Sequence, residues 1–324
     1  MLISVIGGGA WGTALTAHLA RAGKTPKLWA RSQELVADIN NNRQNARYLA
    51  GITLPTGIFA TTNLADLKGT EIALVVIPTQ SLRSVLEEAK PFLSNDTKIL
   101  LCAKGIEKTT GKRTSDIAAE VLPNNPIAVL SGPSFAHDVA RGLPTAVTLA
   151  APTLAMATSL SETISSQGLR TYASNDVIGA ELGGALKNVI ALAVGMARAR
   201  KLGASAEAAL TTRGFAELSR IARHFGAQPE TLMGLSCLGD LMLTCSSPQS
   251  RNFAYGMAVG NGDDLTQMKL AEGVHTTSIA AKICKEASIS APIIDAIDAV
   301  LSDALPIDEA MRKLMQRPLK AEIG

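Results

Sequence analysis

The chain has 324 residues, of which 47% are hydrophobic, 18% charged and only 3% aromatic, with a formal net charge of +3. Because chains beyond about 250 to 300 residues usually stop adding to a single core, we predict two domains with cores of Ala, Leu, Ile and Val. The sequence has no Lys/Arg cluster with interleaved aromatic residues, which excludes a nucleic-acid footprint and favours a small anionic ligand.

The cysteines do not indicate a disulfide or zinc framework, because none of them form a C-x-x-C pair. We expect reduced, buried thiols and no metal site. The first residues lead straight into a predicted strand, without a basic segment or cleavage site. The apolar run from Val189 to Ala197 is far shorter than the roughly 20 residues that span a bilayer. The sequence therefore predicts a cytoplasmic location, no secretion and no membrane span.

A glycine-rich turn follows the first predicted strand, Leu2 to Ile6, and precedes a helix from Thr13 to Ala22. Its glycines have the spacing G-x-G-x-x-G: Gly7 permits a tight turn, Gly9 lets a pyrophosphate approach the backbone, and Gly12 lets helix and strand pack closely. The free N–H groups at the helix start would hold the phosphates. A purely structural turn is the alternative, but this context favours a dinucleotide site.

Arg31 lies at the end of the second predicted strand, about 20 residues after the glycines, where dinucleotide folds contact the adenosine ribose. An acidic residue would accept the 2′-hydroxyl of NAD, whereas Arg31 can pair with a 2′-phosphate or stack on adenine. The sequence therefore favours NADPH over NADH. An arginine that simply faces solvent is the alternative.

Strands and helices alternate up to about residue 175, which is typical of a doubly wound parallel sheet of the Rossmann type. The near-continuous apolar runs indicate strands that are buried on both faces. The remaining predicted strands are Ile72 to Ile77, Lys98 to Cys102, Ile127 to Leu130, Ala146 to Leu149 and Leu169 to Tyr172, with helices such as Ser81 to Ala89 and Thr114 to Val121.

Beyond Asn175 and Asp176 the sequence is helical throughout, with helices from about Asp176 to Lys201 and from Ala206 to Phe225. The fold class is therefore α/β, with a dinucleotide-binding Rossmann domain at 1–175. An all-α domain that binds substrate and carries the catalytic residues follows at 176–324.

Polar residues follow two neighbouring strands of the predicted sheet. Lys104 comes after one strand, and the loop from Ser131 to Ala136 comes after the next. Ligands of such sheets bind beyond the carboxyl ends of the strands, so this shared position favours a binding role. Ordinary turns at strand ends are the alternative, because Gly-Pro is a common turn sequence.

The segment from Glu181 to Gly195 places one lysine, Lys187, on an otherwise almost wholly apolar helix. Gly183, Gly184 and Ala191 flank it and leave room beside the ammonium group, where the glycines are expected to admit substrate. A lysine whose stem covers apolar surface is one interpretation, and a partly desolvated catalytic lysine is the other.

Asp240 is the only carboxylate in the apolar segment from Gly234 to Cys245, and a buried aspartate needs a partner, for which Lys187 is the obvious cation. A surface aspartate is the alternative.

The next segment resembles a helix start, with Ser247 as the N-cap and Pro248 in the first helical position. Free N–H groups and a guanidinium in its first turns would make a phosphate site; an exposed arginine near a cap is the alternative. The residues of this site are Ser250, Arg251 and Asn252.

These motifs together resemble the bacterial NAD(P)-dependent glycerol-3-phosphate dehydrogenases, in the family's order and over nearly the whole chain. The matching segments are Gly-Gly-Gly-Ala-Trp-Gly-Thr, Ala-Lys104-Gly, Ser-Gly-Pro-Ser-Phe-Ala, Glu-Leu-Gly-Gly-Ala-Leu-Lys187-Asn-Val-Ile, Thr212-Arg-Gly-Phe-Ala-Glu217, Leu-Gly-Asp240-Leu, Ser-Arg-Asn252 and Glu272-Gly-Val. Ala50 stands where the family usually has proline, which affects the details of that loop only.

The resemblance implies reduction of dihydroxyacetone phosphate to sn-glycerol 3-phosphate, which feeds glycerophospholipid synthesis. It implies Lys187 as the proton donor or acceptor, with Lys104 and Asp240 as further catalytic residues. The residues that it places around the substrate are Lys104, Gly132, Ser134, Lys187, Asp240, Ser250, Arg251 and Asn252. The cofactor contacts, for NADP or NAD, are the glycine turn with Gly7, Gly9, Ala10, Trp11 and Gly12, and then Arg31, Tyr48, Lys104, Ala136, Arg251, Leu270 and Glu272.

Two other classes of protein remain open at this stage. A related two-domain reductase of hydroxyacids or ketopantoate could share the lysine helix, but it would not need a phosphate site at Ser-Arg-Asn252. A non-catalytic dinucleotide sensor would bind cofactor without turnover. A homodimer is compatible with the resemblance, and the sequence does not settle the oligomeric state.

Overall fold

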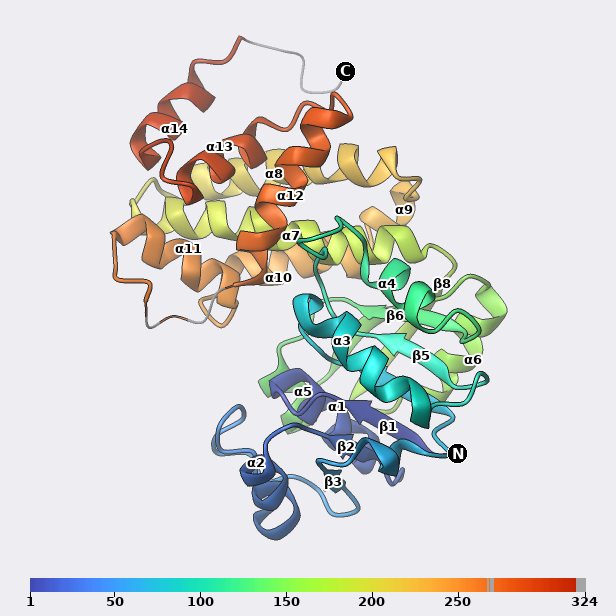
Figure 1. Ribbon diagram of the computed structural model, residues 1–324. Helices are drawn as coiled ribbons and strands as arrows, with labels where there is room; N and C mark the ends of the chain where they lie inside the picture. Colours follow the sequence, from blue (N-terminus) through green and yellow to red (C-terminus); the bar gives the residue numbers. More distant parts are fainter. Residues whose placement is uncertain (267, 269–270, 319–324) are drawn as a thin grey trace.

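The structure is a computed structural model that describes residues 1–266, 268 and 271–318. It has a sheet flanked by helices in the N-terminal half and a group of packed helices in the C-terminal half. Figure 1 shows the sheet in the lower part of the view and the helices above it, with the N-terminus in the sheet part and the last described helix at the far end. This arrangement confirms the predicted fold class.

In the described part of the chain, eight strands form one sheet in the order β3-β2-β1-β4-β5-β6-β7-β8. Strands β1 to β6 are parallel, and the reversal of strand order lies between β1 and β4, where dinucleotides bind in such sheets. The strands are β1 (Ile3–Ile6), β2 (Lys27–Trp29), β3 (Phe59–Thr61), β4 (Ile72–Val75), β5 (Lys98–Leu101), β6 (Ile127–Ser131), β7 (Thr145–Ala150) and β8 (Leu169–Ser174).

Two details of the sheet differ from the sequence prediction. β7 runs antiparallel to β6, with Leu130 opposite Leu149, so the sheet is not parallel throughout. An apolar run that is buried on both faces looks the same in either direction, so the pattern carried no information on strand direction. Strand β3 was not predicted, because its three residues are too short to give a periodic signal.

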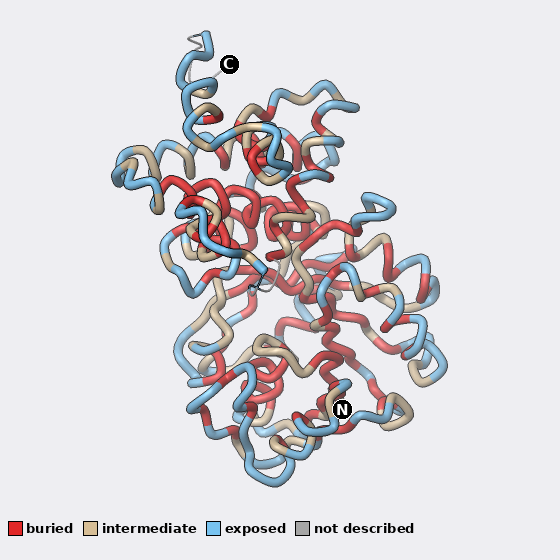
Figure 2. Tube along the Cα trace, turned by 60° about the vertical axis from the view of Figure 1, so that its left-hand side comes forward, coloured by how far each residue is buried: buried red, intermediate tan, exposed pale blue. Residues whose placement is uncertain are grey.

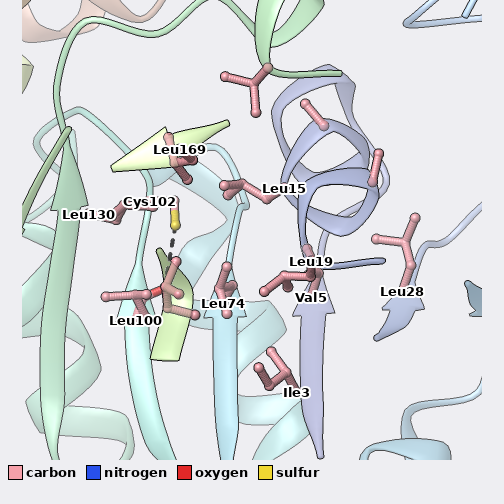
Figure 3. Close-up of a cluster of buried hydrophobic side chains, with 14 of the residues drawn as sticks. Ile3, Val5, Leu15, Leu19, Leu28, Leu74, Leu100, Cys102, Leu130 and Leu169 are labelled. Carbon is pink, nitrogen blue, oxygen red and sulfur yellow. Dashed lines mark hydrogen bonds between the residues drawn. The ribbon is translucent and has the colours of Figure 1, made fainter. Parts of the chain in front are cut away.

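The central strands β1, β4 and β5 are buried on both faces, as the apolar runs predicted, whereas the edge strand β8 exposes Arg170 and Tyr172. Leu100 packs with β1 and α1 on one face, whereas Ile99 and Leu101 belong to a separate cluster on the other face. Figure 3 shows the first cluster, in which Leu15 and Leu19 of α1 lie over Val5, Leu74 and their neighbours. The helices around the sheet are α1 (Ala10–Arg21), α2 (Gln33–Ala37), α3 (Thr79–Ala89), α4 (Thr114–Val121), α5 (Ala136–Arg141) and α6 (Leu154–Ile164). Helix α1 thus begins three residues earlier than predicted.

The C-terminal half is built around α7 (Val177–Ala199), which packs against α8, α10, α11 and α12. It is longer than the apolar run suggested and matches a membrane span in length and composition. However, 89% of that apolar stretch is buried inside the protein (Figure 2), so its hydropathy is accounted for by its place in the core. The other helices are α8 (Ala204–His224), α9 (Pro229–Leu232), α10 (Asp240–Ser246), α11 (Arg251–Asn261), α12 (Glu272–Glu286), α13 (Pro292–Leu301) and α14 (Ile307–Met315).

Helix α7 starts directly after the sheet, with Asp176 as its N-cap. One oxygen of Asp176 accepts the N–H of Gly179 at 2.8 Å, and the other accepts the N–H of Gln228 at 2.8 Å. This carboxylate therefore fixes where the helix begins and ties it to the loop before α9. The division into domains at 1–175 and 176–324 stays a prediction.

Candidate active site

One buried carboxylate joins two lysines at the junction of the sheet and the helices. The Nζ atom of Lys187 lies 2.6 Å from Oδ1 of Asp240, and Nζ of Lys104 lies 2.8 Å from Oδ2. Asp240 is only 1% exposed and Lys187 is 6% exposed, so this is a desolvated site. The lysine on the apolar helix and the lone carboxylate of the apolar segment are thus direct partners. Lys104 is the third member, which sequence spacing did not indicate.

Two loops after neighbouring strands deliver Lys104 to this carboxylate. Lys104 follows β5, and its Nζ also donates a 3.1 Å hydrogen bond to the carbonyl of Gly132, which follows β6. Gly132 has a φ of +152°, and a Cβ there would lie 2.8 Å from Cα of Val147, so only glycine fits this turn. Ser134 donates to the same carbonyl at 3.2 Å. The two loops therefore form one connected edge of the site.

The sequence suggested that the glycines of α7 leave an open space for substrate beside Lys187. In the structure, neighbouring protein atoms occupy that space. A Cβ at Gly183 would lie 2.5 Å from Cβ of Cys237, and one at Gly184 would lie 2.8 Å from the hydroxyl of Ser131 and 3.3 Å from Cγ of Lys104. Gly184 lets α7 approach the end of β6 and the stem of Lys104, and Gly183 lets it approach the segment that carries Cys237.

Burial lowers the pKa of Lys187 from 10.5 to about 8. Desolvation is the largest cause, because the charged ammonium loses water; Asp240 opposes it by stabilising the charge, and Lys104 adds to it by repulsion. A lysine with a pKa of about 8 is still mostly protonated at pH 7, but its neutral fraction is far larger than that of an ordinary lysine, which suits a group that gives and takes a proton near neutrality.

The sequence analysis missed two residues that contact the lysines. The hydroxyl of Thr244 accepts a hydrogen bond from Lys187 at 2.5 Å, and Asn188 donates from Nδ2 to the backbone carbonyl of Lys104 at 3.4 Å. Thr244 lies four residues after Asp240 on α10, so the helical period could have placed both on one face. Asn188 directly follows Lys187, and its role in holding the β5 loop depends on a contact across 84 residues.

The predicted phosphate site lies at the start of α11, although the cap is Ser250 and not Ser247. The hydroxyl of Ser250 accepts the N–H of Phe253 at 3.3 Å, whereas Ser247 ends α10 in an extended conformation. Pro248 therefore precedes the helix. Arg251 is exposed, and Asn252 is largely buried because its amide oxygen accepts the N–H of Gly273 at 2.8 Å.

Glu272, the first residue of α12, connects the helices to the sheet. One carboxylate oxygen accepts the N–H of Thr79, at the start of α3, at 3.3 Å. Burial raises its pKa, while charges on Arg251, Lys104 and Lys187 act in the opposite direction. The charges of Arg251 and of the two lysines therefore all act on this one carboxylate.

The glycine turn after β1 has the shape that a dinucleotide requires. Gly7 has a φ of +128°, and a Cβ there would lie 2.3 Å from the carbonyl oxygen of Val76; a Cβ at Gly12 would lie 1.8 Å from that of Gly7. At Gly9, by contrast, no atom lies within 4 Å of the Cβ position. Helix α1 begins there without a side-chain cap and without an acidic residue in its first turn. This open, electropositive helix start fits a pyrophosphate.

The other predicted cofactor residues, apart from Lys104, Arg251 and Glu272, come from separate segments of the chain. Trp11 is half-buried on α1, Ala136 begins α5, and Arg31 is exposed beyond the end of β2. Tyr48 is 37% exposed, and the guanidinium of Arg47 lies 5.4 Å from its ring centre. Leu270 lies outside the described residues. A metal site is not indicated, because the part of the chain that the structure describes has no cluster of three His, Cys, Asp or Glu residues.

A doubly wound sheet with a dinucleotide turn, joined to helices that carry a buried lysine, is typical of a dinucleotide-dependent oxidoreductase. Comparisons with known proteins narrow this class. Family models described as NAD-dependent glycerol-3-phosphate dehydrogenase N-terminus and C-terminus match residues 2–157 and 176–312. The chain therefore belongs to the NAD-dependent glycerol-3-phosphate dehydrogenase family.

Individual relatives agree with this assignment. The chain is 54% identical over 321 residues to a glycerol-3-phosphate dehydrogenase (NAD(P)+) of Chelativorans sp. strain BNC1, with 99% of this chain and 98% of the relative covered. The crystal structure of a glycerol-3-phosphate dehydrogenase from Coxiella burnetii matches with a TM-score of 0.92 at 35% identity, covering 98% and 99% of the two chains. A ketopantoate reductase from Ralstonia eutropha JMP134 has a TM-score of 0.64 at 17% identity, covering 96% and 100%, which shows a shared fold alone.

Proposed function

We propose that the protein reduces dihydroxyacetone phosphate to sn-glycerol 3-phosphate with NADPH or NADH, reversibly, and so supplies glycerophospholipid synthesis. The observation that supports this most strongly is the buried Asp240, which holds Lys187 and Lys104 together, while Arg251 of α11 and both lysines act on the same carboxylate, Glu272. The two lysines suit a carbonyl oxygen that becomes an alkoxide, and Arg251 suits a phosphate.

Lys187 is the proposed acid in the reduction. The bound reduced nicotinamide supplies a hydride to C2 of the substrate. As negative charge develops on the carbonyl oxygen, Lys187 stabilises it and donates the proton from Nζ, while Lys104 adds a second positive charge. Asp240 keeps both Nζ atoms in place and offsets their repulsion. In the reverse direction, neutral Lys187 accepts the proton of the C2 hydroxyl.

The substrate phosphate is assigned to the start of α11. Arg251 can form paired hydrogen bonds with phosphate oxygens, and the free N–H groups and positive dipole of the helix start add to the attraction. Ser250 and Asn252 flank it, with Gly132 and Ser134 on the opposite loop. Fixing the phosphate orients C2 between Lys187 and the nicotinamide position, which lowers the entropic part of the barrier.

The proposed substrate is tested by NADPH absorbance with dihydroxyacetone phosphate and with dihydroxyacetone. We expect turnover with the phosphorylated ketone and a kcat/KM lower by roughly 100-fold or more without the phosphate, because charged hydrogen bonds are lost. Equal turnover of both, or preference for ketopantoate, would contradict the assignment. Absence of turnover in folded, NADPH-bound protein would instead support the dinucleotide sensor.

The pKa of Lys187 predicts opposite pH profiles for the two directions. Reduction needs the protonated lysine, which is lost as the pH rises through about 8, so kcat/KM for dihydroxyacetone phosphate should fall above that pH. Oxidation of glycerol 3-phosphate needs the neutral lysine and should rise over the same range. Steady-state rates from pH 7 to 10, where the substrate phosphate is fully ionised, measure both. Profiles that move in the same direction would exclude this role.

Arg31 is the proposed determinant of NADPH preference. Replacing Arg31 by alanine should reduce the ratio of kcat/KM for NADPH over NADH by about tenfold, because one charged hydrogen bond to the 2′-phosphate is lost. The substitution should lower kcat/KM for NADPH and leave kcat/KM for NADH nearly constant. An unchanged ratio would mean that this exposed arginine faces solvent in the complex as well.

We also propose that the protein acts in the cytoplasm, without a nucleic-acid partner or a membrane span. All four cysteines are buried as free thiols, which suits a reducing compartment. A homodimer stays a prediction.

A further inference from the structure

Asn45 is a buried polar residue outside the site residues named so far, and it contacts the glycine turn directly. Only 1% of it is exposed. Its Nδ2 group donates to the carbonyl oxygen of Gly8 at 3.1 Å and to the hydroxyl of Thr13 at 2.7 Å. Its Oδ1 atom accepts the N–H of Tyr48 at 3.3 Å. One amide thus connects the turn, the first helix and the segment that carries Arg47 and Tyr48.

The chemistry of these partners requires a donor at this position. A carbonyl oxygen such as that of Gly8 can only accept, so the side chain that contacts it must donate. The amide oxygen adds an acceptor for the N–H of Tyr48, which also donates to the backbone carbonyl of Asn45 at 3.2 Å. Aspartate has the same shape, but it would place a carboxylate oxygen against the Gly8 carbonyl. Asn45 also accepts the N–H of Leu49 at its own backbone carbonyl, at 2.8 Å, which closes the segment on itself.

The bond to Gly8 fixes more than one atom of the turn. In a trans peptide the carbonyl and the following N–H point in opposite directions, so holding the Gly8 carbonyl toward Asn45 turns the Gly9 N–H away from it. The Cβ position of Gly9 is open for 4 Å. On its other side Gly8 is packed tightly, since a Cβ there would lie 2.6 Å from Cβ of Ala30. The Gly8–Gly9 peptide is therefore held between Asn45 and the end of β2.

We propose that Asn45 is a positioning residue for the cofactor. It sets the orientation of the Gly8–Gly9 peptide before the pyrophosphate arrives, and it holds the segment with Arg47 and Tyr48 against the turn. The cofactor thereby meets a formed site and does not have to order it, which favours tight binding. This inference rests on the proposed function, because it requires the dinucleotide to bind at the glycine turn.

The test compares NADPH affinity among matched variants by fluorescence titration, alongside melting temperature and steady-state kinetics. Asn45→Asp should weaken NADPH binding about tenfold, because a buried acceptor loses its donor and faces a charge. Thr13→Val, which removes the second partner with little change of shape, should weaken it less. In both variants, kcat at saturating NADPH and KM for dihydroxyacetone phosphate should stay within about twofold of wild type. General destabilisation does not produce a loss that is confined to NADPH affinity.

Asn40→Ala is the matched control. Asn40 makes two side-chain hydrogen bonds with the backbone of Ala60, each of 2.9 Å, and has none of the contacts with the glycine turn that Asn45 makes. It should lower the melting temperature without changing NADPH affinity. If Asn45→Asp binds NADPH as wild type does, or if affinity in all variants simply follows melting temperature, the inference is wrong while the proposed function stands. If wild type itself does not bind NADPH, both fail.

Discussion

Replacing Lys187 by alanine should lower kcat for dihydroxyacetone phosphate reduction by about a thousandfold, within the range that a positioned general acid contributes. NADPH affinity should change little, because Lys187 lies on α7 and the glycine turn lies beyond the ends of β1 and β4. The fold should tolerate the change, since Asp240 keeps Lys104 as its partner at 2.8 Å. Stopped-flow and steady-state absorbance measure the loss, and fluorescence titration measures the affinity.

Lys187→Met and Lys282→Met separate charge from volume in this experiment. Methionine fills the buried position without a titratable group, so it should be as inactive as alanine. Lys282 is an exposed lysine on α12, and its replacement should leave kcat unchanged. Retained activity in either Lys187 variant would remove this residue from its proposed role.

Asp240→Asn should be the second most damaging substitution. The carboxylate lies 2.6 Å and 2.8 Å from the two Nζ atoms, so its neutralisation leaves two cations close together with little water. An uncompensated buried charge lowers the free energy of unfolding by on the order of 3 to 5 kcal/mol. Lys187 therefore loses its proton more easily than in wild type. The pKa of Lys187 should then fall further below its value of about 8, and kcat at pH 7.5 should fall by roughly 100-fold.

The stability of this variant should depend on pH with a known sign. A lysine whose pKa is lower in the folded than in the unfolded state binds fewer protons when folded, so the free energy of unfolding rises with pH between the two pKa values. The deficit of Asp240→Asn relative to wild type should therefore shrink as the pH rises to about 8 in urea titrations and stay constant above it, because wild-type Lys187 also loses its proton there. Asp96→Asn, at an exposed loop position, should show no deficit. A deficit that grows with pH would mean that the lysines do not gain from Asp240.

The parts of the site that the sequence predicted are those with a local signal. Glycines spaced as Gly7, Gly9 and Gly12 between a strand and a helix are typical of a dinucleotide-binding turn, and the open space at Gly9 agrees with this interpretation. Lys187 and Asp240 stood out because each is a single charge in an apolar segment, and a buried charge needs a partner. The family resemblance then supplied roles that no spacing could give.

The parts that the sequence did not predict depend on contacts between distant segments. Lys104 reaches Asp240 across 136 residues, and Asn45 reaches Gly8 across 37. Gly183 and Gly184 were interpreted as space for substrate, because a sequence does not say whether a missing side chain leaves a gap or admits a neighbour. Ser247 and Ser250 are both competent helix caps with an extended backbone, and only the start of α11 at Arg251 shows which of them caps the helix.

The central claim is that Lys187 passes the proton as hydride reaches C2 of dihydroxyacetone phosphate. It is tested most directly by single-turnover oxidation of enzyme-bound NADPH by that substrate, from pH 7 to 10, in wild type and Lys187→Met. We predict a wild-type rate that falls as the pH rises through about 8, and a variant rate that is about a thousandfold slower and independent of pH. A variant that retains the wild-type rate and its pH dependence would contradict the account.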